Sequence, residues 1–281
     1  MKIGIIGSSG FLGKNLYNFL IQNTKSKIFK FPSFHKHKNK WLSLVVSKIK
    51  REKFDILINC SADQKIDKNE LNVINQLNSN LLSNILFLME GQKNKNFKGY
   101  ISFGTKWEFG DGKEKKPLNF YAATKKANDI FFDYFSNKET SIISLKIFDT
   151  YGENDRRKKF FNDLLKSYKK NKILKITAGQ QYLDYVHIND ICLLIFKIIF
   201  DIKSKKLKGF KYYTVSSKRP IKLINFIKML NTILKKEIKT KIEKDYRNNE
   251  SFNRIKKIFN YPGWKIKTNF KKELKKIFDG C

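Results

Sequence analysis

A tyrosine and a lysine in the sequence YAATK have the types and spacing of a proton-transfer pair. Tyr121 and Lys125 are four residues apart, so on a helix both side chains project from one face. The lysine ammonium could hold down the pKa of the tyrosine and also reach the ribose of a cofactor. The pair indicates redox chemistry at a carbonyl or an alcohol. In a lysine-rich chain, a packed tyrosine beside a solvated lysine is the alternative.

A glycine-rich sequence, GSSGFLG, precedes this pair and provides a second feature with chemical meaning. The apolar run KIGIIG predicts a buried parallel strand, and FLGKNLYNFL continues with helical periodicity. Between them, Gly7 would permit a tight turn, Gly10 would let the backbone approach a pyrophosphate, and Gly13 would allow close helix packing. The order of strand, glycine turn and helix predicts a dinucleotide site, and a purely structural turn is the alternative.

The elements around these motifs predict an α/β fold. Apolar runs at residues 54–59, 99–103 and 142–148 alternate with helix-like stretches, as in a doubly wound parallel sheet of the Rossmann type. From Tyr151 onward the sequence changes to lysine-rich helical segments. We expect a Rossmann domain over residues 1–150, joined by about 186–215, and a smaller, mostly helical C-terminal substrate domain within 151–281.

The composition and the placement of apolar residues argue against a disulfide-bonded protein and against a membrane-spanning one. A chain of 281 residues with 41% hydrophobic content can form one large core and an additional lobe. Its three cysteines, Cys60, Cys192 and Cys281, form no even framework, which indicates free thiols and a reducing compartment. The first strand begins directly after Met1, and the apolar stretch 191–200 is too short to span a membrane. We therefore expect a cytoplasmic protein with no membrane partner.

The formal net charge of +34 raises the question of nucleic-acid binding. Lysines supply nearly all of this positive charge and are dispersed along the whole chain. A surface that recognises nucleic acid would instead cluster arginines, whose guanidinium groups bind phosphate through two hydrogen bonds. We expect no specific nucleic-acid partner. The positive field would still attract small anionic substrates.

Taken together, these motifs resemble the extended short-chain dehydrogenase/reductase family of nucleotide-sugar enzymes, the NAD(P)-dependent epimerases and dehydratases. The similarity runs along essentially the whole chain. Within that family, the runs GTKW, YAATKKA, FDTYG and DRRKK look most like the reductases that make CDP-abequose and related deoxysugars. The segments that carry the resemblance are GSSGFLG, INCSAD, the helix Asn80, SFGTKWEFG, YAATK, LKIFDTYGENDRRKKFF, QQYLDYVHINDI and YPGWKIK.

This resemblance implies NADPH-dependent reduction of the 4-keto group of a nucleotide-diphosphate deoxysugar, such as a CDP-4-keto-3,6-dideoxyhexose. Such sugars enter surface polysaccharides, including the lipopolysaccharide O-antigen. Tyr121 would protonate the developing alkoxide, Thr105 would orient that oxygen, and Lys125 would bind the ribose and keep the tyrosine acidic. For Thr105, a strand-end hydroxyl bonded only to backbone is the alternative.

Departures from the family pattern reduce the number of reactions that the resemblance allows. The family's 4,6-dehydratases carry Asp and Glu directly after the catalytic Thr, and here Lys106 and Trp107 stand there, which disfavours dehydration. The epimerase/reductases that make GDP-fucose place a Cys where Trp107 stands, which disfavours double epimerisation. Trp107 could stack on the sugar or belong to the core. Glu108 is expected either to contact substrate or to be solvated.

Cofactor preference depends on the segment after the second predicted strand, where an NAD enzyme carries an acid against the ribose. Pro32 or Ser33 falls at that position, and His35, Lys36 and Lys38 follow. This composition favours the 2′-phosphate of NADP over NAD, and a solvated basic loop is the alternative.

The resemblance also implies which residues contact the cofactor. They are Gly7, Ser9, Gly10, Phe11, Leu12, Gly13, Ser33, Lys36, Cys60, Ser61, Ala62, Asn80, Tyr121 and Lys125. No metal site is expected, because His35 and His37 have no cysteine or carboxylate partner nearby in the sequence.

For the nucleotide sugar, we expect a cationic clamp after the FDTYG turn, formed by Arg156, Arg157, Lys158 and Lys159, because arginine and lysine bind diphosphates. Many relatives also have an arginine before the later aspartate, and here Leu183 precedes Asp184. Asp149 could contact the sugar or base, or cap a turn. The expected substrate contacts are Thr105, Lys106, Trp107, Asp149, Arg156, Arg157 and Lys158.

Other functions remain open at this point. A nucleotide-sugar 4-epimerase uses the same three catalytic residues with a retained NAD, and an inert NADP-sensing or scaffold protein could share the fold. Family members commonly pair as homodimers through two helices, which here would be 71–89 and 121–135. Several apolar side chains of these segments recur at helical spacing, which favours a homodimer.

Overall fold

The computed structural model describes residues 1–37, 40–64, 69–112, 116–243 and 253–280. Lys38, expected near a cofactor phosphate, and Cys281 lie outside these ranges. Among the described residues, no helix is long and apolar enough to cross a membrane.

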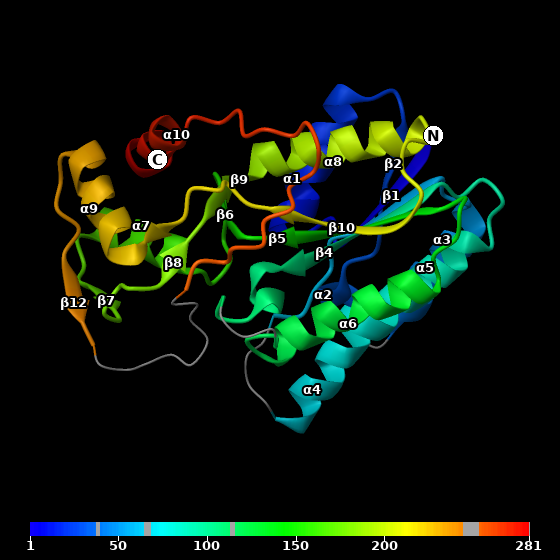
Figure 1. Cartoon of the computed structure of the whole chain (residues 1–281), viewed down its shortest axis with the longest axis horizontal. Coiled ribbons are helices and arrows are strands. Elements are labelled where there is room, and N and C mark those ends of the chain that lie inside the picture. The colour runs from blue at the N-terminus through cyan, green and yellow to red at the C-terminus, as the bar shows by residue number, and fades with distance from the viewer. Residues whose placement is uncertain (38–39, 65–68, 113–115, 244–252, 281) are drawn as a thin grey trace.

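A six-stranded, all-parallel sheet forms the centre of the larger lobe, with strand order β10-β5-β4-β3-β1-β2 (Figure 1). The order reverses around β1, whose neighbours β2 and β3 lie on opposite sides. Ligands of doubly wound folds bind at the carboxyl ends of the strands beside such a reversal. The strands are β1 (Lys2–Ile6), β2 (Lys27–Lys30), β3 (Ile56–Asn59), β4 (Gly99–Thr105), β5 (Ser141–Ile147) and β10 (Gly209–Val215).

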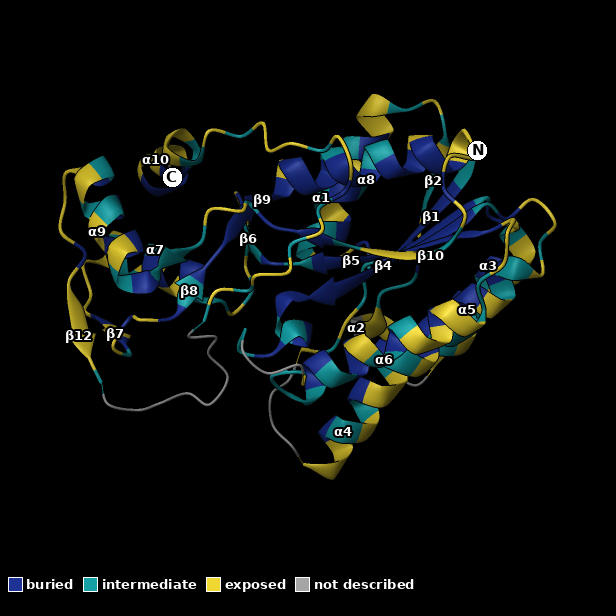
Figure 2. Ribbon diagram, viewed as in Figure 1, coloured by how far each residue is buried: buried dark blue, intermediate teal, exposed yellow. Residues whose placement is uncertain are grey.

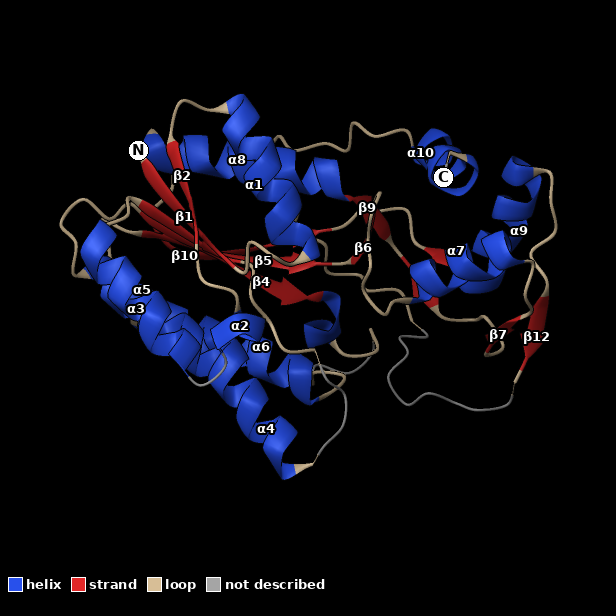
Figure 3. Ribbon diagram, turned by 180° about the vertical axis from the view of Figure 1, so that it is seen from behind, coloured by secondary structure: helices blue, strands red, loops and turns tan. Residues whose placement is uncertain are grey.

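Helices cover both faces of this sheet (Figure 3). Every residue of β3 and β4 is buried, because helices cover both faces of these central strands (Figure 2). Such strands are typically continuous apolar runs in the sequence. One face packs against α1 (Phe11–Asn23) and α8 (Ile188–Lys203), and the other against α3 (Trp41–Glu52), α5 (Ser83–Gln92) and α6 (Phe120–Tyr134). The predicted doubly wound fold is confirmed.

The helix expected over 71–89 is interrupted by a different helical geometry. It runs as α4 (Glu70–Gln76), a π-helical segment η2 (Leu77–Leu82) and then α5. π-helical turns are rare and often occur at functional sites. The short helices α2 (Phe34–His37) and η3 (Lys106–Phe109) follow β2 and β4.

A second hydrophobic cluster lies beyond the carboxyl edge of the sheet, in a smaller lobe. Its helices are α7 (Phe160–Lys170), α9 (Leu223–Leu234) and α10 (Phe270–Asp279). Strand pairs β6–β9, β7–β12 and β8–β11 accompany them, so the lobe is less purely helical than expected. These strands are β6 (Asp149–Tyr151), β7 (Leu174–Ile176), β8 (Tyr182–Leu183), β9 (Tyr185–His187), β11 (Ile221–Lys222) and β12 (Thr240–Ile242).

The chain returns to the larger lobe between the two halves of the smaller one. Helix α8 packs against α1, and β10 pairs with β5 at the edge of the sheet. On this basis we propose the discontinuous division expected from the sequence, with residues 1–150 and about 186–215 in one domain.

Candidate active site

The turn between β1 and α1 is shaped by its glycines. Gly7 has φ +74°, and a Cβ there would lie 2.6 Å from the Ser61 backbone nitrogen. A Cβ on Gly13 would overlap the Gly7 oxygen and lie 2.8 Å from the Cα of Ser8. Gly10 is the N-cap of α1 and makes no side-chain cap, so the first N–H groups of the helix are available to an anion. The turn therefore fits the pyrophosphate of a dinucleotide.

The segment after β3 lies against this turn. Cys60 donates its N–H to the Ile6 oxygen at 2.9 Å, and Ser61 donates its N–H to Asn59 Oδ1 at 3.0 Å. Ala62 follows directly. The structure thus brings the Cys60–Ala62 segment next to Gly7, where we expect it to line the cofactor.

Asn80 holds the same segment in place. Its Nδ2 donates to the Asp63 oxygen at 2.9 Å, and its Oδ1 accepts the Asp63 N–H at 2.9 Å. The backbone oxygen of Asn80 accepts from Asn128 Nδ2 at 2.8 Å, which ties η2 to α6. Asn80 is fully buried and lies in the π-helical segment. Its contacts within the protein are to the loop after β3 and to α6.

The residues after β2 run alongside the start of the glycine turn. In the parallel register, Ile5 lies beside Lys30, so Phe31 to Ser33 follow alongside Ile6 to Ser8. Ser33 is half-buried, and Lys36, on α2, is exposed. No carboxylate occurs between β2 and the end of α2.

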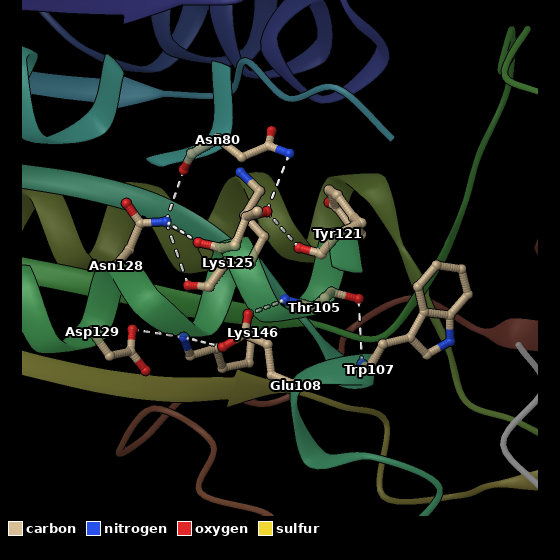
Figure 4. Close-up of polar contacts among 10 residues, drawn as sticks. Asn80, Thr105, Trp107, Glu108, Tyr121, Lys125, Asn128, Asp129 and Lys146 are labelled. Atoms are coloured by element: carbon tan, nitrogen blue, oxygen red, sulfur yellow. Dashed lines mark hydrogen bonds and ion pairs between the residues drawn. The ribbon is translucent and has the colours of Figure 1, made fainter. Parts of the chain in front are cut away.

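Tyr121 and Lys125 lie on α6, which packs against β4. The helix begins after Asn119, whose side chain accepts the Ala122 N–H at 2.9 Å. Tyr121 is 8% exposed and Lys125 is 3% exposed, and Thr105 at the end of β4 is 8% exposed. Figure 4 shows these three side chains together between α6 and the end of β4. Spacing on one helix and the strand end thus bring the expected trio together.

The protonation states of the pair follow from burial and from neighbouring charges. Burial raises the pKa of Tyr121, Glu108 raises it further, and a hydrogen bond with Gln64 and the charge of Arg157 lower it. Burial lowers the pKa of Lys125 to about 8. The sequence led us to expect Lys125 to lower the tyrosine pKa, whereas Gln64 and Arg157 have that effect here.

Thr105 is the N-cap of η3 and takes part in a capping box. Its Oγ1 accepts the Trp107 N–H at 3.4 Å, and Glu108 Oε1 accepts the Thr105 N–H at 2.8 Å. The Trp107 ring meets the Tyr121 ring edge-on, with centroids 6.4 Å apart. Trp107 is therefore a wall of the site next to the tyrosine.

Glu108 is not solvated, so that expectation for it was wrong. It is 3% exposed, and Oε2 lies 2.5 Å from Lys146 Nζ. Lys146, on β5, also pairs with Asp129 Oδ1 on α6 at 2.7 Å. The sequence contains no local signal for this network, because its members come from three elements.

The expected cationic clamp is not gathered in one place. Arg157 makes two bonds to Asp155, at 2.8 and 2.7 Å, and its guanidinium lies over the Phe11 ring with 4.3 Å to the centroid. Arg156 and Lys158 are exposed. Phe11 belongs to the first turn of α1, so Arg157 lies beside the glycine turn.

Two other lysines lie near the end of β4, beside Asp149 and Trp107. Lys106 Nζ pairs with Asp149 Oδ2 at 2.6 Å, which places Asp149 beside the strand end. Lys159, the last residue of the expected clamp, has Nζ 5.5 Å from the centroid of the Trp107 ring. Burial and the neighbouring Arg157 lower the pKa of Lys159.

A cavity of about 330 Å³ opens between Lys106 and the smaller lobe. Among the described residues, its walls carry Lys106, Lys218, Arg254 and Lys256 against a single carboxylate, Asp184. That carboxylate accepts bonds from the Ser216 hydroxyl at 2.6 Å and the Ser217 N–H at 2.7 Å. The remaining lining residues are Phe148, Tyr182, Ser216, Pro220, Asn253, Ile255 and Ile258. The cavity therefore has the charge and size to take an anionic ligand.

The sequence did not identify most of this cavity. Lys218 and Lys256 cannot be told apart from the dispersed lysines, and Arg254 follows no motif. Among the residues that the structure describes, no group of three or more His, Cys, Asp or Glu side chains could hold a metal ion.

Known proteins share both the sequence pattern and the fold. A family model described as the NAD dependent epimerase/dehydratase family matches residues 3–208. A protein named CDP-abequose synthase from Yersinia pseudotuberculosis is 30% identical over 212 residues, which cover 71% of this chain and 73% of that protein.

Solved structures show the same fold at low sequence identity. UDP-glucuronic acid 4-epimerase from Bacillus cereus, in complex with UDP-glucuronic acid and NAD, has a TM-score of 0.80 at 18% identity, covering 99% of this chain and 98% of that one. RMD from Pseudomonas aeruginosa, complexed with NADPH, has a TM-score of 0.78 at 16% identity and covers 99% of both chains.

The family resemblance seen in the sequence is thereby confirmed. The family model spans well over half of the chain, and the glycine turn fits the nicotinamide dinucleotide that such a fold binds. This chain is an enzyme of the NAD-dependent epimerase/dehydratase family, which acts on nucleotide sugars.

Proposed function

We propose that the enzyme reduces the 4-keto group of a nucleotide-diphosphate deoxysugar with NADPH, in the synthesis of a surface polysaccharide such as the lipopolysaccharide O-antigen. The observation that carries this proposal is the buried trio of Thr105, Tyr121 and Lys125 beside the glycine turn. The similarity to CDP-abequose synthase supports a CDP-linked 3,6-dideoxy sugar as the substrate.

The two positions after Thr105 support reduction over dehydration. Elimination of water needs an acid and a base near the sugar, and neither side chain there is a carboxylate. Lys106 is paired with Asp149, and Trp107 packs edge-on against Tyr121. A proton donor and a hydroxyl remain, which suffice for carbonyl reduction.

Each member of the trio has one role in the proposed reaction. Bound NADPH supplies a hydride to the carbonyl carbon. Tyr121 donates its phenol proton to the carbonyl oxygen, and the raised pKa keeps that proton in place at neutral pH. Thr105 Oγ1 accepts a bond from Trp107, so its own proton is available for a hydrogen bond to the same oxygen. Lys125 binds the cofactor ribose.

We place the nucleotide diphosphate in the cavity beside Lys106. Lys218 and Arg254 would face its negative charge, while Asp184 is held by its hydrogen bonds from Ser216 and Ser217. Lys159 over Trp107 would lie between this cavity and the reacting sugar.

A panel of CDP-, dTDP-, GDP- and UDP-linked 4-keto sugars tests the proposed reaction. We expect loss of NADPH absorbance with at least one substrate, greatest for the CDP-linked 3,6-dideoxy sugar. No consumption of NADPH with any member of the panel would refute the proposal. Purified protein that carries stoichiometric NAD would favour the 4-epimerase instead.

Cofactor preference gives a second expected result. NADPH should bind at least about tenfold more tightly than NADH, a difference of about 1.4 kcal/mol, because residues 31–37, which follow β2, include no carboxylate that would repel the 2′-phosphate. Ser33→Asp should shift the ratio of dissociation constants toward NADH, as measured by fluorescence titration. Ser204→Asp, at the far end of α8, adds the same charge away from the turn and should leave the ratio unchanged. A ratio that Ser33→Asp does not alter would show that Ser33 lies away from the ribose.

We also propose that the enzyme is a homodimer. Exposed apolar side chains lie along the helical stretch from α4 to α5 and along α6, which run side by side (Figure 1). Ile130 is 74% exposed and Tyr134 is 80% exposed, which is costly for an unpaired surface. The remaining members are Leu71, Ile74, Leu77, Leu82, Met89 and Phe131.

Light scattering at physiological salt should give twice the 33.2 kDa chain mass. The double variant Ile130→Glu/Tyr134→Glu should yield the monomer at micromolar concentration, because two buried charges per subunit oppose pairing. Phe200→Glu, on the opposite side of the sheet and 58% exposed, serves as the matched control and should remain a dimer. A wild-type monomer would rule out the homodimer.

A further inference from the structure

A buried ion pair behind the strand end has no role in the reaction proposed above. Lys146 is 1% exposed and Glu108 is 3% exposed, with Nζ and Oε2 2.5 Å apart. Removing two charges from water costs several kcal/mol per ion, which offsets most of their attraction. A buried ion pair therefore adds little to the stability of the fold. Its position next to the catalytic trio suggests another reason for its presence.

The pair belongs to a row of side chains, joined by ion pairs and hydrogen bonds, that ends at the backbone of Thr105. Asp129 Oδ1 binds Lys146 Nζ at 2.7 Å, Lys146 binds Glu108, and Glu108 Oε1 accepts the Thr105 N–H at 2.8 Å. Figure 4 shows Lys146 between the two carboxylates, with Glu108 next to Thr105. Asp129 is on α6, the helix that carries Tyr121.

The space for this row is tightly restricted. A Cβ on Gly104 would overlap Glu108 Oε1 and lie 2.6 Å from Lys146 Cδ. The carboxylate therefore passes directly under the last residues of β4. Its two oxygens are each committed to one partner, which fixes the backbone at Thr105 relative to β5 and α6.

We propose that Glu108 is a positioning residue for the reduction, held by Lys146 and Asp129, which fixes the Thr105 hydroxyl and supplies a negative charge to the site of Tyr121 and Lys125. This inference rests on the proposed function. Glu108 touches no substrate and acts through Thr105 and through its charge.

Charges around Tyr121 support the electrostatic part. After burial, Glu108 is the largest influence that raises the pKa of Tyr121, and it is opposed by Gln64 and Arg157. Removal of the Glu108 charge would therefore lower the pKa of Tyr121. A tyrosine that loses its proton at lower pH stops acting as the acid at lower pH.

Glu108 also raises the pKa of Lys125. Burial lowers its pKa to about 8, Glu108 raises it, Lys146 lowers it to a smaller extent, and Cys60 raises it. Burial lowers the pKa of Lys146 itself, but Glu108 and Asp129 outweigh burial and raise it, so Lys146 stays charged. Loss of the Glu108 charge, alone or together with that of Lys146, would lower the pKa of Lys125.

The test compares Glu108→Gln with the wild-type enzyme. An amide can still accept the Thr105 N–H, but it no longer balances Lys146. We expect kcat to fall by about 10- to 100-fold with little change in KM, because misplaced catalytic groups commonly have such effects. We also expect the basic limb of the kcat profile to move to lower pH.

A second readout does not depend on turnover. In protein labelled with ¹³C at lysine Cε, the Lys125 resonance is assigned by its absence in Lys125→Met. It should titrate near pH 8 in the wild-type enzyme and at lower pH in Glu108→Gln. If no substrate in the panel is reduced, the proposed function fails, and this titration still tests whether Glu108 sets the charge on Lys125.

Two further variants separate positioning from stability. Asp201→Asn removes a buried carboxylate that binds the Tyr261 hydroxyl at 2.8 Å on the other face of the sheet, and it should lower the melting temperature without moving the pH profile. The double variant Glu108→Gln/Lys146→Met removes both charges, so neither is left buried without its partner. It should fold even if Glu108→Gln alone does not. It should show a similar loss of kcat and a smaller shift of the Lys125 pKa in the same direction, because removal of Lys146 offsets part of the change. Wild-type kcat and an unchanged Lys125 titration in the folded double variant would overturn the proposal.

Discussion

Replacement of Tyr121 by phenylalanine should lower turnover by about 100-fold or more, while cofactor binding survives. The substitution removes only the phenol oxygen, and the remaining ring keeps its edge-on packing against Trp107 at 6.4 Å. The proposed reaction then lacks its proton donor. Steady-state kinetics with the best substrate of the panel, and NADPH titration by fluorescence, measure the two effects separately.

A tyrosine on the same helix provides the control for this variant. Tyr134→Phe removes an identical oxygen from a side chain that is 80% exposed. It should leave turnover at the wild-type value. Near-normal turnover of Tyr121→Phe would remove this residue from the mechanism.

Replacement of Gly13 by valine should weaken NADPH binding by about 100-fold or more, equivalent to about 2.7 kcal/mol. The new Cβ would overlap the Gly7 oxygen and crowd the Cα of Ser8, and both of these are backbone atoms of the turn. Because the backbone would have to move, the N–H groups at the start of α1 would no longer face the pyrophosphate. Titration of NADPH against the variant measures the loss.

Gly10→Ala separates loss of the cofactor site from loss of the fold. A Cβ on Gly10 would lie 3.4 Å from the Gly7 oxygen, a distance at which only a small adjustment is needed. Its melting temperature without cofactor should match the wild type, and its NADPH affinity should fall because the methyl group faces the approaching phosphates. Wild-type NADPH affinity in Gly13→Val would show that the cofactor binds elsewhere.

Much of the fold could be predicted from the sequence, because its signals are local. The apolar run ending at Ile6, the glycine turn and the periodic helix after it are contiguous, and the structure reproduces them in order. Tyr121 and Lys125 were found by their spacing on one helix, and Thr105 by its place at the end of a strand. Such features depend on neighbours in the sequence and need no knowledge of tertiary contacts.

The parts that were missed depend on contacts between distant segments. Lys146 lies 38 residues from Glu108 and 17 from Asp129 along the chain, and in a sequence with 59 lysines and arginines it carries no mark of its own. The expectation of a solvated Glu108 failed for this reason. Arg157 has a local sequence signal and a local partner in Asp155, but its position over Phe11 depends on how two lobes meet.

The π-helical segment was also outside the reach of the sequence pattern. Periodicity predicted one continuous helix over 71–89, and the short change to π-helical hydrogen bonds at 77–82 has no sequence signal that we identified. The consequence is local but relevant, since Asn80 lies in this segment and holds the loop at Asp63.

Transfer of deuterium from labelled cofactor to sugar is the most direct measurement of the proposed reaction. The enzyme is incubated with NADPH that carries deuterium at the transferred position of the nicotinamide and with a CDP-linked 4-keto-3,6-dideoxy sugar. We expect one deuterium at carbon 4 of the product by NMR, and one NADPH oxidised for each ketone lost. A ketone that persists with no oxidation of NADPH, while the enzyme inverts carbon 4 of the corresponding 4-hydroxy sugar without added cofactor, would contradict the reductase and identify an epimerase with a retained NAD.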